Sequence, residues 1–329
     1  MTRGERAIRQ EERRMEKEKK RRIELANKML IPVGEKTSQS LGLLSFDPSG
    51  VFRLGNNLWL KVFTTDSVQN FAEDVAQNIL GTLRMTIYLS ESGKATCHLS
   101  LIEEGEIYEE VREKFTDDEA VLKGIRPMTA DDVMGSISAN FYRDIRFSYA
   151  SFVRGKKDWK KECFHEIEEK KASFKMGRLF GESMTVISYA DGIVPIDISD
   201  LLAISCPMYI SFQMKSLKGE AEIYFRRYME KQYNRKLLDS SEDALINQSL
   251  SISFFCDSLD ARKIVENTLA SYFLSKGILL IPGFGDQKTI AESNLSYGLI
   301  GYDPYRNVGL DAAKNMIGGE NFESSKIEV

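Results

Sequence analysis

Short apolar segments with strand character alternate with amphipathic helical segments, and this alternation limits the fold more than any other feature of the chain. The second half shows it most clearly, because apolar runs of five to seven residues are separated there by helical patterns. Strands separated by helices of this length favour sheets covered by helices. We expect strands at 184–190, 208–214, 250–256 and 278–282, and helices around Asp200, from Lys218 to Leu237 and from Leu259 to Lys276.

The first half has the same order of segments. A strand pattern at 51–65 contains Asn56-Asn57, which predicts a hairpin, and a helical pattern follows Asp66. Strands at 85–90 and 95–102 come next, then an acidic helical segment and a helix that begins at a capping-box pattern, Thr129-x-x-Asp132. We therefore predict an α+β protein with α/β layers, built from two sheet-plus-helix halves. Since both halves run strand, helix, strand, a duplicated ferredoxin-like unit is one arrangement that fits.

The N-terminal segment is strongly basic. Residues 3–22 carry ten Lys or Arg and five acids, so the rest of the chain has a net charge of −9 within an overall charge of −4. Such an arm on an acidic body suits a protein that touches an anionic surface, either a membrane or a nucleic acid. We expect the arm to be a frayed helix or disordered. The predicted divisions are a basic arm over 1–30, an α/β half over 31–168, a second half over 169–301 and a polar tail over 302–329.

The sequence lacks the patterns that carry nucleotide or metal chemistry. It contains no GxxxxGK[ST] loop, and Gly283 and Gly285 are not followed by the third glycine of a dinucleotide-binding loop. His98 and His165 are the only histidines, and neither has metal-ligand spacing to a cysteine. The acidic segment 103–119 lacks the spacing of a calcium loop, and we interpret it as a solvated helix face. We expect no enzymatic activity, no cofactor and no metal site.

The cysteine spacing and the hydropathy of the sequence favour a cytoplasmic protein without a membrane-spanning segment. No run approaches the roughly 18 apolar residues that a membrane span needs. The cysteines are scattered singly, which is typical of reduced thiols in a cytoplasmic protein. They are Cys97, Cys163, Cys206 and Cys256.

Two basic segments are candidates for contact with an anionic partner. The arm suits anionic lipid or nucleic acid, and a plain solubilising tail is the alternative. The segment 224–236 interleaves aromatic and basic residues, as single-stranded nucleic acid would require. The alternative is an amphipathic helix with solvated basic residues, whose sheet-facing residues are Ala221, Phe225, Tyr228 and Met229. The candidate residues are Arg13, Arg14, Lys17, Lys19, Lys20, Arg21 and Arg22 in the arm, and Tyr224, Arg226, Arg227, Tyr228, Lys231 and Arg235 in the second segment.

Several longer segments share their order and apolar pattern with a known family. They are ANKMLIPVGEK, FDPSGVFRLGNNLWLKVFTTDS, MTADDVMGSISANFYRDI, GRLFGESMTVISYADGIVPIDISDLL and LDARKIVENTLASYFLSKGILLIPGFGDQKTIAESNLSYG. In this order the chain resembles, over roughly residues 30 to 300, the N-terminal domain of the conjugation and type IV secretion ATPases, the CagE/TrbE/VirB family, in the form found in Gram-positive mobile elements. The resemblance lies in element order and apolar patterns and not in an invariant motif.

In that family a RecA-like ATPase lobe with a phosphate-binding loop follows this domain, whereas this sequence ends at Val329 without one. The resemblance therefore implies a non-catalytic component of a conjugative DNA-transfer or type IV secretion machine. It would dock on a transfer ATPase or on membrane channel proteins at the cytoplasmic face of the membrane. The chain is either a portion of a longer protein or a paralogue without the motor, and its polar ending favours the paralogue. The alternative function is a single-stranded DNA-binding accessory protein of a mobile element, and an enzyme with an unrecognised site is a third hypothesis.

Overall fold

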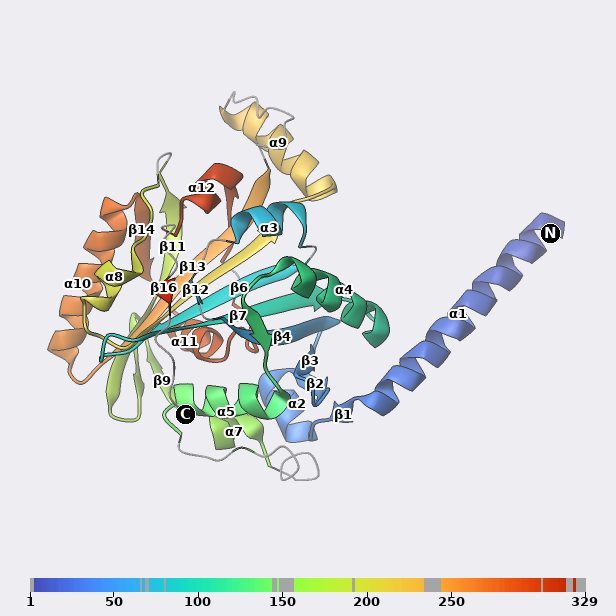
Figure 1. The fold of residues 1–329 in the computed structure, drawn as a ribbon, viewed down its shortest axis with the longest axis horizontal. Helices are drawn as coiled ribbons and strands as arrows, with labels where there is room; N and C mark the ends of the chain where they lie inside the picture. Colours follow the sequence, from blue (N-terminus) through green and yellow to red (C-terminus); the bar gives the residue numbers. More distant parts are fainter. Residues whose placement is uncertain are drawn as a thin grey trace.

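The computed structural model describes residues 3–65, 67–68, 71–79, 81–143, 147, 157–190, 193–233, 244–302, 304–317 and 322–323. Over these residues the protein is a mixed α+β structure with 11 helices and a large, 14-stranded antiparallel sheet (Figure 1). The α+β class expected from the alternating pattern is confirmed. Asp66 and Arg235, which the sequence singled out, lie outside the described residues.

The large sheet takes strands from both halves of the chain. Its strands from the first half are β1 (Ile31–Pro32), β2 (Leu43–Phe46), β3 (Val51–Leu54), β4 (Leu58–Thr65), β6 (Thr82–Leu89), β7 (Ala95–Glu104) and β8 (Ile125–Pro127). Those from the second half are β9 (Ile167–Lys170), β10 (Ser173–Met176), β11 (Leu179–Tyr189), β12 (Met208–Ser216), β13 (Leu245–Cys256), β14 (Ile278–Pro282) and β15 (Arg306–Gly309). A separate two-stranded sheet pairs β5 (Ser67–Val68) with β16 (Phe322–Glu323).

The two halves are joined strand to strand. β6 pairs with β12 in an antiparallel register that runs from Leu89 opposite Met208 to Thr82 opposite Lys215. The expectation of one sheet in each half is therefore wrong, since a single sheet crosses both. The physical reason is that each half alone would leave β6 or β12 as a long edge with unpaired backbone groups, and the pairing removes both edges.

The same strand order occurs in each half. In the first half the order is β8-β4-β7-β6, with α3 (Ala72–Gln77) between β4 and β6 and α4 (Tyr108–Val121) between β7 and β8. In the second half the order is β14-β11-β13-β12, with α8 (Ile198–Leu202) between β11 and β12 and α10 (Leu259–Ser275) between β13 and β14. All of these pairs are antiparallel. The halves differ in one connection, because a tight turn joins β6 to β7 whereas helix α9 (Glu220–Tyr233) lies between β12 and β13.

Helices cover both faces of the sheet, so the body has three layers. One buried cluster joins α3, α4, α8, α10 and α12 (Leu310–Lys314) to strand residues such as Met85 and Ile210. A second cluster joins α2 (Glu35–Leu41), α5 (Ala130–Asn140), α7 (Trp159–Cys163) and α11 (Gln287–Leu295) to strand residues such as Leu60 and Tyr209. Because successive strand side chains point to opposite faces, central strands such as β4, β12 and β13 contribute to both clusters.

Several local predictions can be compared with the structure. Thr129 and Asp132 form the expected capping box at the start of α5, and Asn56 and Asn57, both with φ of 58°, form the turn between β3 and β4. The predicted division at 168 falls within β9, the first strand of the β9–β10 hairpin. The expected polar tail contains β15, which pairs with β13, and α12, which packs in the first cluster. No helix among the described residues has the length and apolar character needed to cross a membrane.

Candidate functional site

The basic arm is helix α1 (Arg3–Met29), a 27-residue helix that projects from the body (Figure 1). Two of its candidate contact residues face the body. Lys19 forms an ion pair with Glu106, and Arg22 Nη1 donates a hydrogen bond to Glu110 Oε1 at 3.0 Å. Because Glu106 and Glu110 lie at the start of α4, these contacts hold the second half of the helix against the acidic segment. The acidic segment thus pairs with the arm, in addition to being solvated.

The other five candidates lie on a different face of α1. At 3.6 residues per turn, Arg13, Arg14, Lys17, Lys20 and Arg21 fall within about a third of the helix circumference, on the side opposite Lys19 and Arg22. All five side chains are exposed. Lys20 Nζ lies 2.9 Å from Glu16 Oε1 and Arg14 Nη1 lies 3.9 Å from Glu11 Oε1, both within the same helix. The structure therefore presents a basic face that points away from α4.

The second basic segment, α9, stands away from the sheet (Figure 1). Tyr224 is 75% exposed and Tyr228 is 44% exposed, and Arg227 and Lys231 are exposed as well. Of the residues that the alternative places against the sheet, Tyr228 is exposed and Phe225 is half-buried. Arg226 differs from its neighbours because Nη2 lies 2.8 Å from Glu222 Oε1 in an i,i+4 pair. α1 and α9 extend from different parts of the body, so the structure does not bring the two basic segments together.

The two histidines have different surroundings. His98 is half-buried beside Tyr297, with 4.4 Å between the ring centroids, and its desolvation lowers the pKa of His98 to about 4. A neutral imidazole stacked on an aromatic ring in this way contributes to packing. His165 lies at the surface of a cleft, where partial burial and the positive charge of Arg143 lower its pKa. Over the described part of the chain, no group of three His, Cys, Asp or Glu side chains could hold a metal ion.

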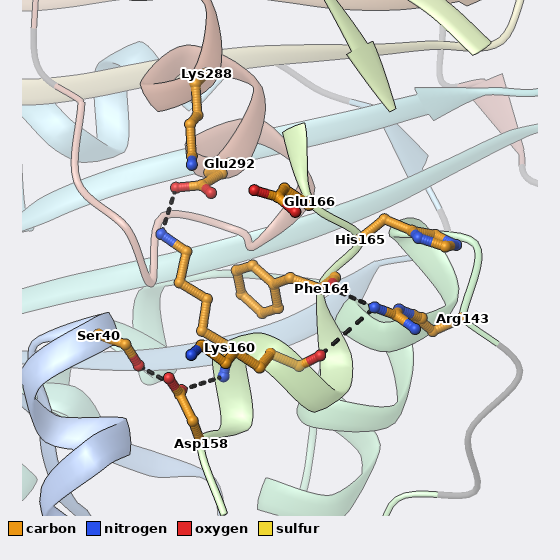
Figure 2. Close-up of a pocket in the computed structure, with 10 residues that line it drawn as sticks. Ser40, Arg143, Asp158, Lys160, Phe164, His165, Glu166, Lys288 and Glu292 are labelled. Atoms are coloured by element: carbon orange, nitrogen blue, oxygen red, sulfur yellow. Dashed lines mark hydrogen bonds and ion pairs between the residues drawn. The ribbon is translucent and has the colours of Figure 1, made fainter. Parts of the chain in front are cut away.

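A charged cleft of about 680 Å³ opens where α2, α7 and α11 meet (Figure 2). Sequence reasoning did not find it, since its residues come from four distant segments that share no motif. The lining residues are Ser40, Arg143, Asp158, Lys160, Lys161, Phe164, His165, Glu166, Lys288 and Glu292.

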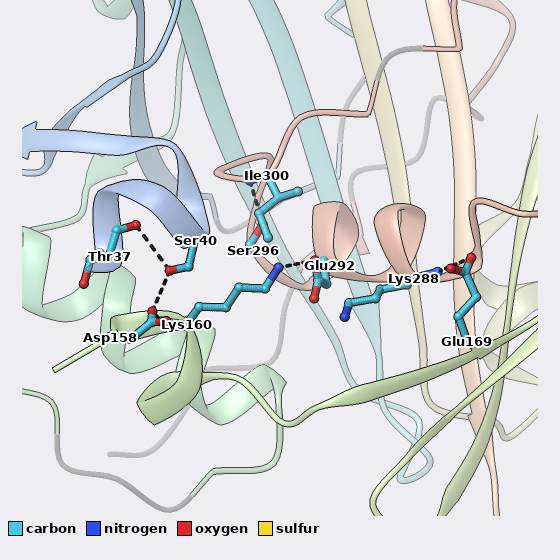
Figure 3. A network of polar contacts seen from close by, with 9 residues as sticks. All are labelled: Thr37, Ser40, Asp158, Lys160, Glu169, Lys288, Glu292, Ser296 and Ile300. Carbon is cyan, nitrogen blue, oxygen red and sulfur yellow. Dashed lines mark hydrogen bonds and ion pairs between the residues drawn. The ribbon is translucent and has the colours of Figure 1, made fainter. Parts of the chain in front are cut away.

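One wall of the cleft is the junction of α2 and α7 (Figure 3). Asp158 is the N-cap of α7 and accepts a hydrogen bond from the Lys160 backbone N–H at 3.0 Å, which is the usual role of an N-cap aspartate. Its carboxylate also accepts a hydrogen bond from Ser40 Oγ at 2.5 Å. In addition, the Trp159 backbone N–H donates to Thr37 Oγ1 at 3.0 Å. The start of α7 is therefore fixed to α2.

The opposite wall is α11, and an ion pair bridges the two walls. Lys160 Nζ lies 2.8 Å from Glu292 Oε2, and the Glu292 side chain is only 6% exposed. The Lys288 backbone N–H donates to Glu169 Oε1 at 3.3 Å, and Arg143 Nη2 donates to the Phe164 carbonyl oxygen at 3.1 Å (Figures 2 and 3). The cleft is thus built from both halves of the chain.

The contacts in the cleft do not form the arrangement of a serine nucleophile. A serine nucleophile needs an imidazole to take its proton, with a carboxylate behind that imidazole. Here Ser40 donates directly to Asp158, and His165 lies elsewhere in the cleft (Figure 2). The cleft instead combines four permanent cations with three carboxylates, a composition suited to a charged ligand or a charged protein segment.

Comparisons with known proteins add no family: no protein-family model matches the chain, and no curated protein matches it.

Proposed function

We propose that this chain is a non-catalytic component of a conjugative DNA-transfer or type IV secretion machine. It docks on a transfer ATPase or on membrane channel proteins at the cytoplasmic face, with α1 held against anionic lipid. The observation that carries the proposal is the orientation of α1, whose Lys19 and Arg22 pair with α4 while its other five candidate residues face outward. The order of elements that resembles the N-terminal domain of the transfer ATPases supports the choice of machine.

The repeated strand order supports the duplication of a ferredoxin-like unit, the arrangement considered from the sequence. Each half has four antiparallel strands in equivalent order, and the two helices that connect them pack in the same buried cluster. This order supports a duplicated ferredoxin-like unit, with α9 inserted into the second copy. The two copies would meet through their equivalent strands, β6 and β12.

The strength of the membrane contact follows from the number of outward cations. Each basic residue near an anionic surface contributes about 1 kcal/mol at low ionic strength. The five outward residues of α1 therefore give about 5 kcal/mol, and screening at physiological salt reduces this value. Lys19 and Arg22 are not included because they are paired with the body. The attraction is enough for peripheral, salt-sensitive recruitment.

Vesicle co-sedimentation tests this contact. We expect the chain to bind phosphatidylcholine vesicles that contain phosphatidylserine, and not vesicles of phosphatidylcholine alone. The triple variant Arg13→Gln, Lys17→Gln, Arg21→Gln should bind at least about tenfold more weakly, since three basic residues contribute about 3 kcal/mol before screening. A variant that neutralises the exposed Lys170, Lys171 and Arg178 loses the same charge elsewhere and should bind as the unmodified chain does. Equal binding to neutral and anionic vesicles would falsify the membrane contact.

Docking on the machine needs a separate test. Crosslinking in the host membrane, followed by purification of the chain and mass spectrometry, should recover a transfer ATPase together with channel proteins. Recovery of the chain without either of them would contradict the proposal.

A single-stranded DNA-binding accessory protein is the second candidate, and the exposed aromatic side chains of α9 favour it. Tyr224 and Tyr228 could stack on bases while Arg227 and Lys231 contact phosphates. Binding of a fluorescent oligothymidine should then weaken steeply with salt, and more than about tenfold in Tyr224→Ala, Tyr228→Ala, because one stacked base contributes about 1–3 kcal/mol. The exposed Phe284→Ala variant is the matched control. Undetectable binding at low salt would remove this candidate.

A further inference from the structure

Two of the four cysteines are brought together by the pairing of β12 and β13. Met208 lies opposite Phe254, and the same register places Cys206 opposite Cys256. A hydrogen bond from the Phe255 backbone N–H to the Pro207 carbonyl oxygen, at 3.0 Å, extends the pairing to this end. The two sulfurs are 3.7 Å apart, and both cysteines are free thiols.

The backbone positions of this pair suit a disulfide. Residues directly opposite on antiparallel strands have Cβ atoms about 4.5–5.5 Å apart, and a disulfide needs about 3.5–4.5 Å. A small approach of the strand ends and a rotation of the side chains would bring the sulfurs from 3.7 Å to bonding distance, with the β12–β13 pairing retained. The other cysteines have no such partner position, since Cys97 lies opposite Thr65 and Ile87 on its neighbouring strands and Cys163 lies in helix α7.

A small reagent has a route to this pair. Cys206 and Cys256 are only 6% and 8% exposed, but both line a cleft of about 400 Å³ between the end of β13 and the start of α10. Apolar side chains such as Ile264 and Leu179 form much of the cleft wall. The hydrogen bond from Cys206 to the Cys256 sulfur holds the pKa of the Cys256 thiol below its usual range, so Cys256 is the more nucleophilic of the two.

We propose that Cys206 and Cys256 form a redox-sensitive pair that a small-molecule disulfide, such as oxidised glutathione, converts to an intramolecular disulfide. The Cys256 thiolate attacks one sulfur of the small disulfide, and a mixed disulfide forms while one small thiol leaves. Cys206 then loses its proton to solvent and its sulfur attacks the Cys256 sulfur, which releases the second small thiol. The protein loses two electrons and two protons, and the small disulfide gains them.

The bridge has a structural consequence. It closes the segment between Cys206 and Cys256, whose ends are 50 positions apart and which contains β12, α9 and β13. Because a crosslink restricts the unfolded chain more than the folded one, the oxidised protein should resist unfolding better than the reduced protein. The bridge also prevents β12 from separating from β13 at the end opposite α9. The proposal does not depend on the proposed transfer function.

Titration of the full chain in glutathione redox buffers tests the pair. Samples are quenched with acid, alkylated in denaturant, digested and analysed by mass spectrometry. We expect a Cys206–Cys256 crosslinked peptide in oxidising buffer, with Cys97 and Cys163 alkylated. Cys206→Ser should accumulate glutathione on Cys256, whereas Cys97→Ser and Cys163→Ser should behave as the unmodified chain does. The urea midpoint of the oxidised chain should rise and should return to its initial value after reduction.

Two results would overturn the proposal. One is that Cys206 and Cys256 remain fully alkylated in the most oxidising buffer while the chain is folded. The other is that crosslinks to Cys97 or Cys163 form as readily as the Cys206–Cys256 crosslink, which would mean that partly unfolded chains react.

Discussion

Replacement of Arg84 by methionine should lower the free energy of unfolding by about 3–5 kcal/mol. Arg84 lies in β6 and is only 2% exposed. Its Nη1 donates hydrogen bonds to Gln213 Oε1 at 3.2 Å and to Ser293 Oγ at 2.9 Å, and its Nη2 donates to Ser211 Oγ at 3.0 Å and to Asn294 Oδ1 at 2.8 Å. One side chain of the first half therefore holds β12 and α11 of the second half.

The magnitude follows from these contacts. In Arg84→Met the four buried acceptors lose this donor, and an acceptor left unsatisfied costs about 1–3 kcal/mol. The loss is smaller at Asn294 Oδ1, which still accepts from Ser251 Oγ, and at Ser211 Oγ, which keeps Thr86 Oγ1 as a partner. This loss of stability is offset by several kcal/mol, because folding of the variant no longer transfers a guanidinium from water into the protein interior. Methionine fills much of the same volume, so little of the loss comes from a cavity. Arg84→Lys keeps the charge and loses the planar fork, and its effect should be intermediate.

Urea unfolding followed by tryptophan fluorescence measures this effect. Trp59 and Trp159 are both buried, the first in the cluster on one face of the sheet and the second in the cluster on the other face. Arg178→Met, at an exposed position in the β10–β11 turn, is the control and should change stability by less than about 0.5 kcal/mol. A loss below about 1 kcal/mol in Arg84→Met would mean that its hydrogen bonds do not hold the two halves together.

Three further predictions concern other contacts. Lys160→Met leaves the Glu292 carboxylate buried without its cation, so unfolding free energy should fall by about 2 kcal/mol, and the double variant with Glu292→Gln should recover part of that loss. Thr129→Ala removes the N-cap of α5 and should cost about 1 kcal/mol in urea unfolding, whereas Thr129→Ser should cost much less. Burial, a hydrogen bond with Asp118 and repulsion by that carboxyl raise the pKa of Glu103 to about 7 from an ordinary 4.5. The folded chain therefore binds this proton more tightly than the unfolded chain, and stability measured against pH should fall between about 4.5 and 7, with a smaller fall in Glu103→Gln.

The features that the sequence predicted correctly are those formed by neighbouring residues. The capping box of α5 needs only Thr129 and Asp132, and the turn between β3 and β4 needs only Asn56 and Asn57. The α+β class follows from the alternation of segments with strand-like and helix-like spacing of apolar residues, and this spacing is also a local property of the sequence. None of these features depends on which distant segments pack together.

Features that depend on distant contacts were missed for a physical reason. β6 and β12 carry polar residues at alternate positions, including Arg84, Ser211 and Gln213, and such alternation predicts a face exposed to water. These residues are buried because α11 covers them with polar side chains of its own, Ser293 and Asn294. A prediction from hydrophobic periodicity assigns polar residues to the exposed face. It fails where buried polar side chains form hydrogen bonds with one another. The charged cleft was missed because its walls come from segments far apart in the sequence.

The same polar layer fixes how the two halves are aligned. If β6 slipped by one residue against β12, its side chains would move to the opposite face, and Arg84 would enter the apolar cluster around Met85 and Ile87. A guanidinium buried there without acceptors would cost several kcal/mol, so the hydrogen bonds select one register. α11 provides two of these acceptors, Ser293 and Asn294, and its neighbouring residues Lys288 and Glu292 line the charged cleft. The register of the central strands therefore also sets the position of α11, and with it the geometry of the cleft.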